Sequence, residues 1–447
     1  MSGGGMGMVS DTAMAALGAA WAEGGGTVVG LAPSAAAAAI LGEQLRTATD
    51  TMAKLTWGIA HNELPGWAEG IGPRTLVVID EAGMADTLSL DAVVEFVVAR
   101  GGSVRLIGDD QQLAAIGAGG VLRDIAANHG SLHLTELMRF TDQAEGAASL
   151  ALRDGLPEAL GFYLDRQRVH VGDLATMTDD VFSAWQADHA AGRDAIMLAP
   201  TRDLVSELNQ RARAHRLDGR PAGPTVQLGD GNQASVGDLI ITRSNDRRLR
   251  TSPTDWVKNG DRWSIVSLQP RGALTVQHAR NGRLVHLPAD YVATAVELGY
   301  ASTIHTAQGL TADTGHTLLT GQESRQLAYT AATRGRMGNH LYLEVVGDGD
   351  VHNVVRPDHV HPLTATDLLE AILARDDSPR SATTMRREDD DPATLLGQAT
   401  ARYLDSLYVA AEQLLGPSGV AILEVQVDRV VPDLTTATPN GHPTDPT

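Results

Sequence analysis

The sequence predicts an α/β protein built on parallel sheets, with a small antiparallel β-barrel in its second half. Two apolar runs, TLVVID (residues 75–80) and SVRLIGDD (103–110), have the length and continuous apolar character of buried parallel strands. Residues 88–100 between them carry helically spaced apolar side chains and end at two glycines, which predicts a helix. Residues 226–293 hold short alternating runs separated by Asn, Gly and Asp, which is typical of a small barrel. A βαβ unit and a later barrel therefore define the expected fold class.

Acidic side chains stand where the two predicted strands end. Asp80 and Glu81 follow the first strand, and Asp109 follows the second. Ligands of open α/β sheets bind at this carboxyl edge, and adjacent carboxylates there suit a hydrated magnesium ion beside a phosphate. A simple cap at the strand end explains an isolated Asp-Glu pair equally well, so the pair alone leaves both interpretations open.

Composition limits the chemistry that this chain can perform. Its 447 residues suffice for two or three domains, and the absence of cysteine excludes disulfides, thiolate zinc sites and cysteine nucleophiles. The net charge of −20 restricts any nucleic-acid contact to a local basic patch. Lys54 and Lys258 are the two lysines, beside 33 arginines. No twenty-residue apolar run or basic–apolar leader occurs, so we expect a soluble, cytoplasmic chain without a membrane partner.

Further motifs follow in a defined order along the chain. GDDQQL (108–113) and LTELMRF (134–140) come after successive strands, and YASTIHTAQGLT (300–311) and YTAATRGR (329–336) lie far downstream. Together with VIDEAGM (78–84), they resemble the superfamily 1B DNA helicases, in particular the RecD-like helicase region of TraI/TrwC-type (MobF) conjugative relaxases. The resemblance covers about residues 12–412. It implies an ATP-dependent helicase or translocase that moves on single-stranded DNA in conjugative transfer.

The resemblance also implies a domain organisation with two RecA-like lobes of the P-loop NTPase kind. The first lobe would span residues 1–137, without the strand that precedes the phosphate loop. The second would be formed by residues 138–225 and 299–347, with the barrel (226–298) inserted into it. Composition and helical periodicity then predict a linker (348–391), a helical segment (392–430) and a disordered tail (431–447).

The cofactors implied by the resemblance are ATP and Mg²⁺. In such helicases the residue at the position of Asp80 holds Mg²⁺, and the one at Glu81 polarises the water that attacks ATP. Gln112 would sense the γ-phosphate, while Arg139 and Arg334 would stabilise the charge that develops during hydrolysis. The other residues expected in the nucleotide site are Asp109, Gln308 and Gly309.

A path for single-stranded DNA is implied as well. VVGLAPSAAAAAIL (28–41) is close to the motif with which the family holds one DNA strand, and TIHTAQG couples DNA to the nucleotide. The expected DNA contacts from these motifs are Pro33, Ser34, Thr303, His305 and Thr311. Besides single-stranded DNA, the implied partner is a relaxase or the rest of a split relaxase–helicase.

Basic and aromatic residues occur together in the predicted barrel. SNDRRLR (244–250), with Arg247 and Arg248, and WVKNGDRW (256–263) suit phosphate contact and base stacking on single strands. Burial in the barrel core explains Trp256 and Trp263 equally well. On a preceding predicted helix, three arginines fit either a solvated helix end or DNA contact; these are Arg211, Arg213 and Arg216.

The phosphate loop is where the sequence departs from the family. A GxxGxGKT loop is expected after an apolar strand, but this chain reads GGGMGMVSDTAM (3–14), with Ser10 and Asp11 in place of the lysine and the hydroxyl residue. Asp11 would bring a negative charge to the phosphates that a lysine normally binds. We expect a start within the motif, by truncation or internal initiation, rather than a redesigned site. Two functions stay open, an active helicase and a non-hydrolysing remnant that binds DNA or a partner; an in-frame GxxGxGKT upstream of Met1 would favour the helicase.

Overall fold

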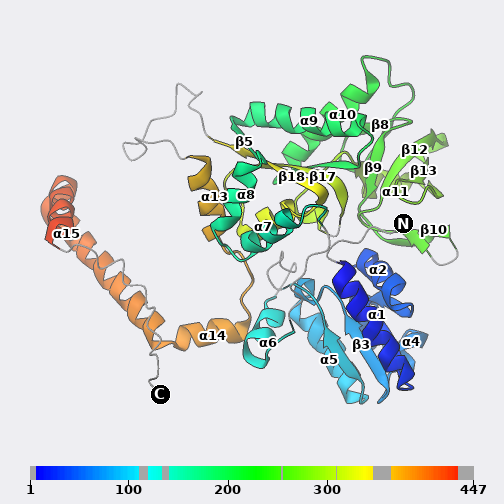
Figure 1. Cartoon of the computed structure of the whole chain (residues 1–447), viewed down its shortest axis with the longest axis horizontal. Helices are drawn as coiled ribbons and strands as arrows, with labels where there is room; N and C mark the ends of the chain where they lie inside the picture. The colour runs from blue at the N-terminus through cyan, green and yellow to red at the C-terminus, as the bar shows by residue number, and fades with distance from the viewer. Residues whose placement is uncertain are drawn as a thin grey trace. The chain divides into compact units, whose positions relative to one another are not determined.

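The computed structural model describes residues 7–109, 119–132, 140–252, 255–308, 310–345 and 364–430. The chain divides into two compact units, residues 1–380 and residues 381–447. The larger unit contains a parallel four-stranded sheet, a parallel five-stranded sheet, an antiparallel five-stranded sheet and short two-stranded ribbons (Figure 1). The α/β class with parallel sheets that the sequence predicts is therefore confirmed.

The first parallel sheet has the strand order β2-β1-β3-β4. Its strand β3 is buried along its whole length, because Val77 and Ile79 pack with residues of α3 and α5 while Leu76 and Val78 pack with residues of α1 and α2. The strands are β1 (Thr27–Ala32), β2 (Ala48–Thr51), β3 (Thr75–Ile79) and β4 (Ser103–Leu106). The helices are α1 (Gly7–Glu23), α2 (Ala35–Leu45), α3 (Met52–His61), α4 (Gly66–Glu69), η1 (Ala82–Met84), α5 (Thr87–Ala99) and α6 (Val121–His129).

The second parallel sheet has the strand order β16-β6-β17-β18-β5 and joins segments that are far apart in the sequence. Strand β6 lies between β16 and β17 although about a hundred residues separate them along the chain. The strands are β5 (Val169–Gly172), β6 (Ala195–Ala199), β16 (Ala301–Thr303), β17 (Ala312–Leu319) and β18 (Gly335–Glu344). The helices are α7 (Gln143–Arg153), α8 (Glu158–Asp165), α9 (Leu174–Ala190), α10 (Arg202–Leu217), η3 (His305–Ala307), α12 (Arg325–Ala331) and α13 (Ala365–Ala374).

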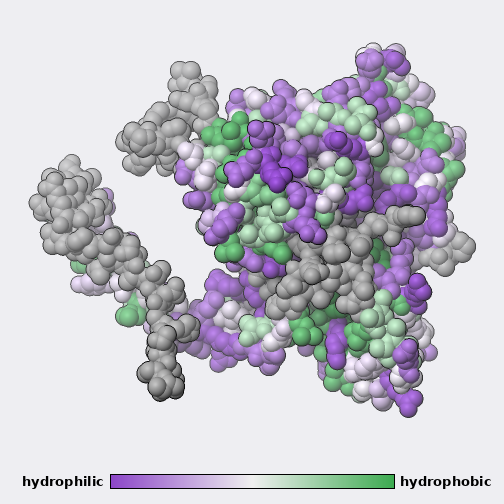
Figure 2. All heavy atoms as spheres, viewed as in Figure 1, coloured by the Kyte–Doolittle hydropathy of each residue, from purple (hydrophilic) through white to green (hydrophobic). Residues whose placement is uncertain are grey.

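Helices around the second sheet turn their apolar sides toward it. Met177, Val181 and Trp185 of α9 belong to the same buried cluster as the strand residues Met197 and Leu318. On the face shown in Figure 2, polar residues predominate around α7 and α9, with smaller apolar areas between them. This distribution is the one expected for amphipathic helices that cover a sheet.

The segment inserted before β16 folds as antiparallel structure, as predicted. A five-stranded sheet has the order β14-β13-β12-β9-β15, and two ribbons pair β10 with β11 and β7 with β8. In the described residues β14 and β15 are the edges of this sheet, so closure into a barrel is not confirmed. The elements are β7 (Val226–Gln227), β8 (Gln233–Ala234), β9 (Leu239–Thr242), β10 (Asp246–Ser252), β11 (Asp255–Val257), β12 (Arg262–Leu268), η2 (Pro270–Gly272), β13 (Leu274–His278), β14 (Leu284–Leu287), α11 (Ala289–Ala295) and β15 (Val296–Leu298).

Burial decides between the interpretations that the sequence left open for this region. Trp263 is fully buried and its indole Nε1 donates to Thr242 Oγ1 at 3.2 Å, so this tryptophan belongs to the core. Arg213 and Arg216 of α10 donate to the buried carboxylate of Asp238 at 3.0 and 2.7 Å. These two arginines therefore hold α10 against the inserted sheet, which is neither of the roles considered from the sequence.

Helix α13 lies within the segment that the sequence predicts as a linker. Its Leu369, Ile372 and Leu373 are buried in the cluster that also contains Leu341 and Leu343 of β18. Residues 365–374 are thus a packed element of the larger unit, and the expectation of a linker is wrong for them. The capping box of Thr364 and Asp367 fixes the start of this helix.

The smaller unit is helical. It contains α14 (Ala382–Asp390) and α15 (Pro392–Val430), and Gly416 interrupts α15 with a left-handed backbone conformation (φ 69°). None of the helices in the described part of the chain combines the length and apolar character needed to cross a bilayer.

Candidate functional site

The carboxyl edge of the first sheet carries Asp80 and Glu81 on a sharp turn. Asp80 continues β3 and donates its backbone N–H to strand β1 at 2.9 Å. Glu81 has a left-handed backbone (φ 51°, ψ 37°), a conformation that costs a non-glycine residue on the order of 1–3 kcal/mol and clusters at functional sites. The backbone of Ala82 then donates to Ile107 O at 2.8 Å, and Gly83 lies against the carbonyl of Asp109. The turn thus holds both carboxylates in fixed positions between the ends of β1 and β4.

Burial raises the pKa of both carboxyl groups. The pKa of Glu81 is raised to about 7, first by burial and then by the charge of Asp80, while the charge of Arg334 acts to lower it. Burial likewise raises the pKa of Asp80, and a hydrogen bond from the backbone of Glu81 opposes that shift. Each carboxyl is therefore harder to ionise than an exposed one.

A divalent cation fits this pair of carboxyls. Two crowded, half-buried carboxylates gain most from a positive charge, and magnesium commonly uses one or two protein carboxylates with water and phosphate as its other ligands. The described residues contain no cluster of three or more His, Cys, Asp or Glu side chains able to hold a metal. The protein part of a magnesium site here would accordingly be small, with Asp80 as its first ligand.

Arg334 lies between the end of α12 and the start of β18 and is buried, with 4% of its surface exposed. Its Nε donates to Thr330 O at 2.8 Å and its Nη2 to Thr333 Oγ1 at 2.7 Å. Its Nη1 donates to Ala307 O at 3.3 Å and to Leu310 O at 3.5 Å. Arg334 thereby fastens the loop of the TIHTAQG stretch to the end of α12, while its charge acts on Glu81.

Tyr329 of α12, a helix beside the second parallel sheet, contacts Asp109, which follows β4 of the first sheet. Its hydroxyl donates to Asp109 Oδ2 at 3.3 Å across 220 residues of sequence. Burial first, and then the negative charge of Asp109, raise the pKa of Tyr329, so the hydroxyl stays protonated as a donor. The charge of Asp109 also acts on Arg153 of α7. Sequence reasoning missed both residues: Tyr329 had a signal as the first letter of YTAATRGR, whereas Arg153 had none.

Residues expected to bind DNA lie at the end of β1. Pro33 and Ser34 follow this strand at the same edge as Asp80. Ser34 caps α2, because its hydroxyl accepts a hydrogen bond from Ala37 N at 3.1 Å, and it remains exposed. A phosphate approaching this helix start would meet free backbone N–H groups and the positive end of the helix dipole.

The other expected DNA contacts lie after β16. Thr303 ends that strand and its hydroxyl bonds Thr306 Oγ1 at 2.8 Å, while His305 is exposed. Gln308 and Thr311 are half-buried in the loop that Arg334 fastens. The loop therefore has an exposed side at His305 and a packed side against Arg334.

Arg247 and Arg248 lie on strand β10 of the inserted segment. Arg247 pairs with Asp50 at the end of β2 in the first sheet, and its guanidinium lies 4.7 Å from the ring centroid of Trp256. Arg248 is exposed and pairs with Asp246 at 2.7 Å. The β10–β11 ribbon thus contacts the first sheet at the edge that also carries Pro33 and Asp80.

Three residues expected in the nucleotide site, Gln112, Arg139 and Gly309, lie outside the described residues.

Both lysines contact tryptophan rings. Lys54 Nζ lies 5.2 Å from the ring centroid of Trp57. Lys258 Nζ lies 5.7 Å from that of Trp256 and bonds Asp255 at 2.5 Å. The positive charge that acts on Glu81 comes from an arginine, Arg334, and not from either lysine.

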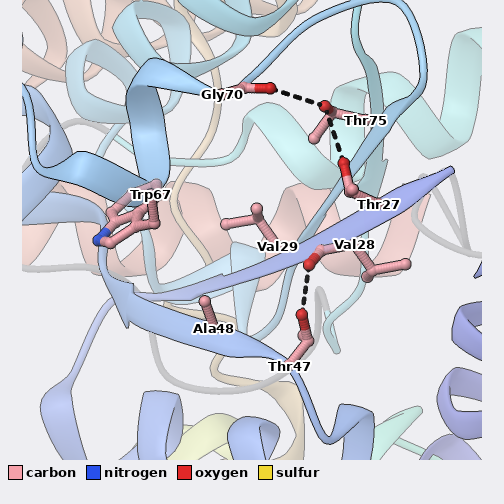
Figure 3. Close-up of a pocket in the computed structure, with 8 residues that line it drawn as sticks. All are labelled: Thr27, Val28, Val29, Thr47, Ala48, Trp67, Gly70 and Thr75. Atoms are coloured by element: carbon pink, nitrogen blue, oxygen red, sulfur yellow. Dashed lines mark hydrogen bonds between the residues drawn. The ribbon is translucent and has the colours of Figure 1, made fainter.

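A cavity of about 350 Å³ opens at the opposite, amino edge of the first sheet (Figure 3). Thr27, Thr47 and Thr75 line it with hydroxyl groups, together with the ring of Trp67. The Thr27 and Thr75 hydroxyls bond each other at 3.2 Å, and Thr47 donates to a backbone carbonyl of β1. Because these hydroxyls are used within the sheet, the cavity carries structural contacts and is separate from the edge with Asp80 and Glu81.

Comparisons with known proteins show what this chain is similar to. A family model described as an AAA domain matches residues 4–174. The chain is 31% identical over 337 residues to a probable conjugal transfer protein TraA of Sinorhizobium fredii, covering 74% of this chain and 30% of that protein. It is 29% identical over 332 residues to the ATP-dependent RecD2 DNA helicase of Deinococcus radiodurans, covering 70% of this chain and 43% of that protein. A solved structure of Bacteroides Pif1 bound to ssDNA is similar over 75% of this chain and 86% of that one, with 16% identity and a TM-score of 0.49.

The chain spans 30% of the length of its TraA relatives. The sequence similarity nevertheless covers about three quarters of this chain. The resemblance that the motifs indicated is thereby confirmed. In sequence the chain is similar to RecD-type DNA helicases and to TraA conjugal transfer proteins, as its motifs indicated.

Proposed function

We propose that this chain is the motor region of a DNA helicase that acts on single-stranded DNA during conjugal transfer. ATP and Mg²⁺ would bind between two RecA-like lobes formed around the two parallel sheets. The observation that carries this proposal is Arg334, which fastens the TIHTAQG loop and whose charge acts on Glu81. In nucleotide hydrolases an arginine that stabilises developing charge is worth about 10³ to 10⁵ in rate.

The residues around Glu81 fit a hydrolytic role. Asp80 would hold Mg²⁺, which supplies the positive charge that keeps the carboxylates ionised. Ionised Glu81 would orient a water molecule and accept a proton from it. The remaining nucleotide contacts that we propose are Asp109, Gln112, Arg139, Gln308 and Gly309.

Single-stranded DNA would cross the edges that carry the exposed motif residues. Ser34 at the start of α2 and His305 after β16 are exposed, and Thr303 ends β16 just before the fastened loop. Arg247 and Arg248 of the inserted segment, which we propose is a small barrel, would add phosphate contacts. A relaxase, or the rest of a longer relaxase–helicase, is the protein partner that the TraA similarity suggests.

A non-hydrolysing DNA-binding protein is the second candidate. The contacts of the two lysines favour it, because Lys54 and Lys258 are engaged by Trp57 and Trp256 and neither acts on Glu81. Without a lysine on the outer phosphates, a nucleotide would be poorly positioned for attack by water. We therefore expect residues 1–447 to bind single-stranded DNA but to hydrolyse ATP very slowly.

ATP hydrolysis with and without single-stranded DNA separates the two candidates. The double variant Ser10→Lys/Asp11→Thr restores the lysine and hydroxyl of GxxGxGKT, and it should raise DNA-stimulated hydrolysis above that of the parent chain. Ser10→Ala/Asp11→Ala is the matched control, because it removes the negative charge without adding the lysine. Robust hydrolysis by the parent chain that Glu81→Gln abolishes would show that our expectation of slow turnover is wrong. Failure of every version to bind single-stranded DNA would contradict both candidates.

A further inference from the structure

Residues 376–378 follow α13 and form a short strap against α12. Gln326, near the start of α12, is buried with 2% of its surface exposed, and within the described residues its amide bonds only to this strap. Its Nε2 donates to Asp376 Oδ1 at 2.6 Å and to Ser378 Oγ at 2.5 Å, and its Oε1 accepts from Asp377 N at 3.0 Å. Because a buried amide is costly to leave without partners, the strap is held firmly on this side.

Arg325 and Arg375 strengthen the same attachment. Arg325 Nη2 donates to Asp376 Oδ2 at 2.6 Å, and the backbone N–H of Arg325 donates to Arg375 O at 2.9 Å. Burial acts to raise the pKa of Asp376, but hydrogen bonds from Ser378 and Gln326 and the charge of Arg325 lower it to about 2. Asp376 is therefore ionised at every pH at which the protein would be studied.

On its other side the strap contacts α6, which packs with the first sheet. Arg123 of α6 donates from Nη2 to Ser378 Oγ at 2.8 Å, and its Nη1 lies 3.9 Å from Asp376 Oδ2. Pro379 lies against Gly119, where an added Cβ would stand 3.0 Å from its ring. The strap thus bridges a helix of the second parallel sheet and a helix of the first.

Helix α6 itself lies directly over the residues that follow the carboxylates. A Cβ added to Gly108 would stand 3.2 Å from Leu122 Cδ2, and one added to Gly83 would stand 3.6 Å from the same atom. Gly83 is two residues after Glu81, and Gly108 immediately precedes Asp109. Arg123 directly follows Leu122, the residue of α6 that contacts the turn with Asp80 and Glu81.

We propose that the strap is a latch between the two parallel-sheet regions, with Asp376 and Ser378 as positioning residues and Arg123 as its release point. The latch would keep α12, which carries Tyr329 and leads to Arg334, aligned with the carboxylates of the first sheet. The hydrogen bond between Tyr329 and Asp109 is a second, separate contact that holds the same two regions together. The role of the latch in aligning the site rests on the proposed function, whereas the contacts that form the latch do not.

The two sides of the latch differ in strength, which predicts where it opens. Within the described residues, the α12 side has a buried amide with three hydrogen bonds and a close ion pair. The α6 side has one hydrogen bond, an ion pair at 3.9 Å between partly exposed groups and the contact of Pro379 with Gly119. Partly exposed ion pairs contribute little to stability. Opening should therefore separate Arg123 from the strap and leave the strap attached to α12.

Distance measurements between the two regions test the latch. The chain has no cysteine, so Glu95→Cys on α5 and Ser183→Cys on α9, both exposed, allow two spin labels to be placed without other changes. In this labelled protein, Arg123→Gln should lengthen the mean distance and broaden its distribution, while Arg123→Lys should return it toward the parent value. Gln326→Leu should instead lower the free energy of unfolding, because it removes the buried amide and leaves the strap without its partners.

Arg211→Gln is the matched control, since it removes an arginine whose ion pairs with Asp179 and Glu207 lie far from the strap in sequence and within the second region. An unchanged distance distribution in Arg123→Gln, equal to that of Arg211→Gln, would overturn the latch. No nucleotide or DNA is needed for this experiment. A widened distribution together with a failure to bind single-stranded DNA would therefore support the latch while contradicting the proposed function.

Discussion

Asp80 and Glu81 at the edge of the first sheet and Arg334 beside the second sheet show two ways of holding a charge below a protein surface. The two carboxyls are crowded, half-buried and raised in pKa, and Glu81 occupies a strained backbone conformation. Arg334 is more deeply buried, yet its guanidinium donates to three backbone carbonyls and a hydroxyl. The burial of Arg334 is thus offset by more hydrogen bonds than the burial of the two carboxyls.

Because of this difference, the ionisation of Glu81 and the position of Arg334 depend on different factors. The ionisation of Glu81 depends on pH and on any cation that binds beside it, because among the described residues the charge of Arg334 opposes the effects of burial and of Asp80. The position of Arg334 depends on packing and on hydrogen bonds within the protein that need no ligand. Substitutions on the two sides should therefore differ in size and in pH dependence.

The largest expected effect is that of Arg334→Ala. It removes the buried hydrogen bonds that the guanidinium donates to the carbonyls of Ala307, Leu310 and Thr330, so we expect a loss of about 2–4 kcal/mol in the free energy of unfolding. Urea denaturation measures this loss, and Arg105→Ala, an exposed arginine on β4, is the control. The pKa of Glu81 should rise as well, because the charge that lowers it is removed. A loss no larger than that of Arg105→Ala would contradict the hydrogen-bonded position of Arg334.

Glu81→Gln should have the next largest effect, and one that depends on pH. The folded-state pKa of Glu81 lies above its ordinary value of 4.5, at about 7, so the folded protein binds the extra proton and stability falls as pH rises through this window. Glutamine mimics the protonated form. The variant should match the parent near pH 4 and exceed it near pH 8 by roughly 1–3 kcal/mol, since each pKa unit corresponds to about 1.4 kcal/mol. Glu95→Gln, exposed on α5, should show no such divergence, and added Mg²⁺ should reduce the difference if the cation binds there.

A smaller effect is expected for Tyr329→Phe. The variant keeps the buried ring and removes only the hydroxyl that donates to Asp109 at 3.3 Å, so the loss should be about 1 kcal/mol. Tyr163→Phe is an informative comparison, because the Tyr163 hydroxyl is also buried but has no hydrogen-bond partner among the described residues. Urea unfolding of the two variants should show Tyr329→Phe as the more costly. Equal effects would mean that the bond to Asp109 contributes nothing measurable.

Local pattern made the first sheet and its acidic edge predictable. The continuous apolar run of β3 can be buried only between two layers, and Asp80 must then lie at its carboxyl end. The same reasoning could not find the bond between Tyr329 and Asp109, because no periodicity relates residues 220 positions apart. Nor could it find the strained backbone of Glu81, since the turn is imposed by the pairing of Ala82 with Ile107.

Charge misled the prediction for the region after β18. The acidic stretch from Asp376 onward suggested a linker, but Asp376 is used as an ion-pair and hydrogen-bond acceptor and the preceding α13 packs its leucines inward. In the inserted segment the alternating pattern predicted antiparallel strands correctly. It could not distinguish the buried Trp263 from the half-buried Trp256, because alternation identifies two faces but not which of them is covered.

The smallest effect on stability is expected from Arg247→Ala combined with Arg248→Ala, and it should appear instead in DNA binding. Arg248 is exposed and Arg247 is half-exposed in its ion pair with Asp50, so both changes should leave the free energy of unfolding nearly unaltered. If both guanidinium groups contact phosphates, each contributes about 0.7 to the salt dependence of single-strand binding, and the slope of log K against log salt should fall by about 1.4. Fluorescence anisotropy of a labelled oligonucleotide at several salt concentrations measures this slope, with Arg220→Ala/Arg280→Ala as the control pair of exposed arginines. An unchanged slope would assign Arg247 to its pairing with Asp50 alone and leave the edge of the first sheet and the loop after β16 as the route for DNA.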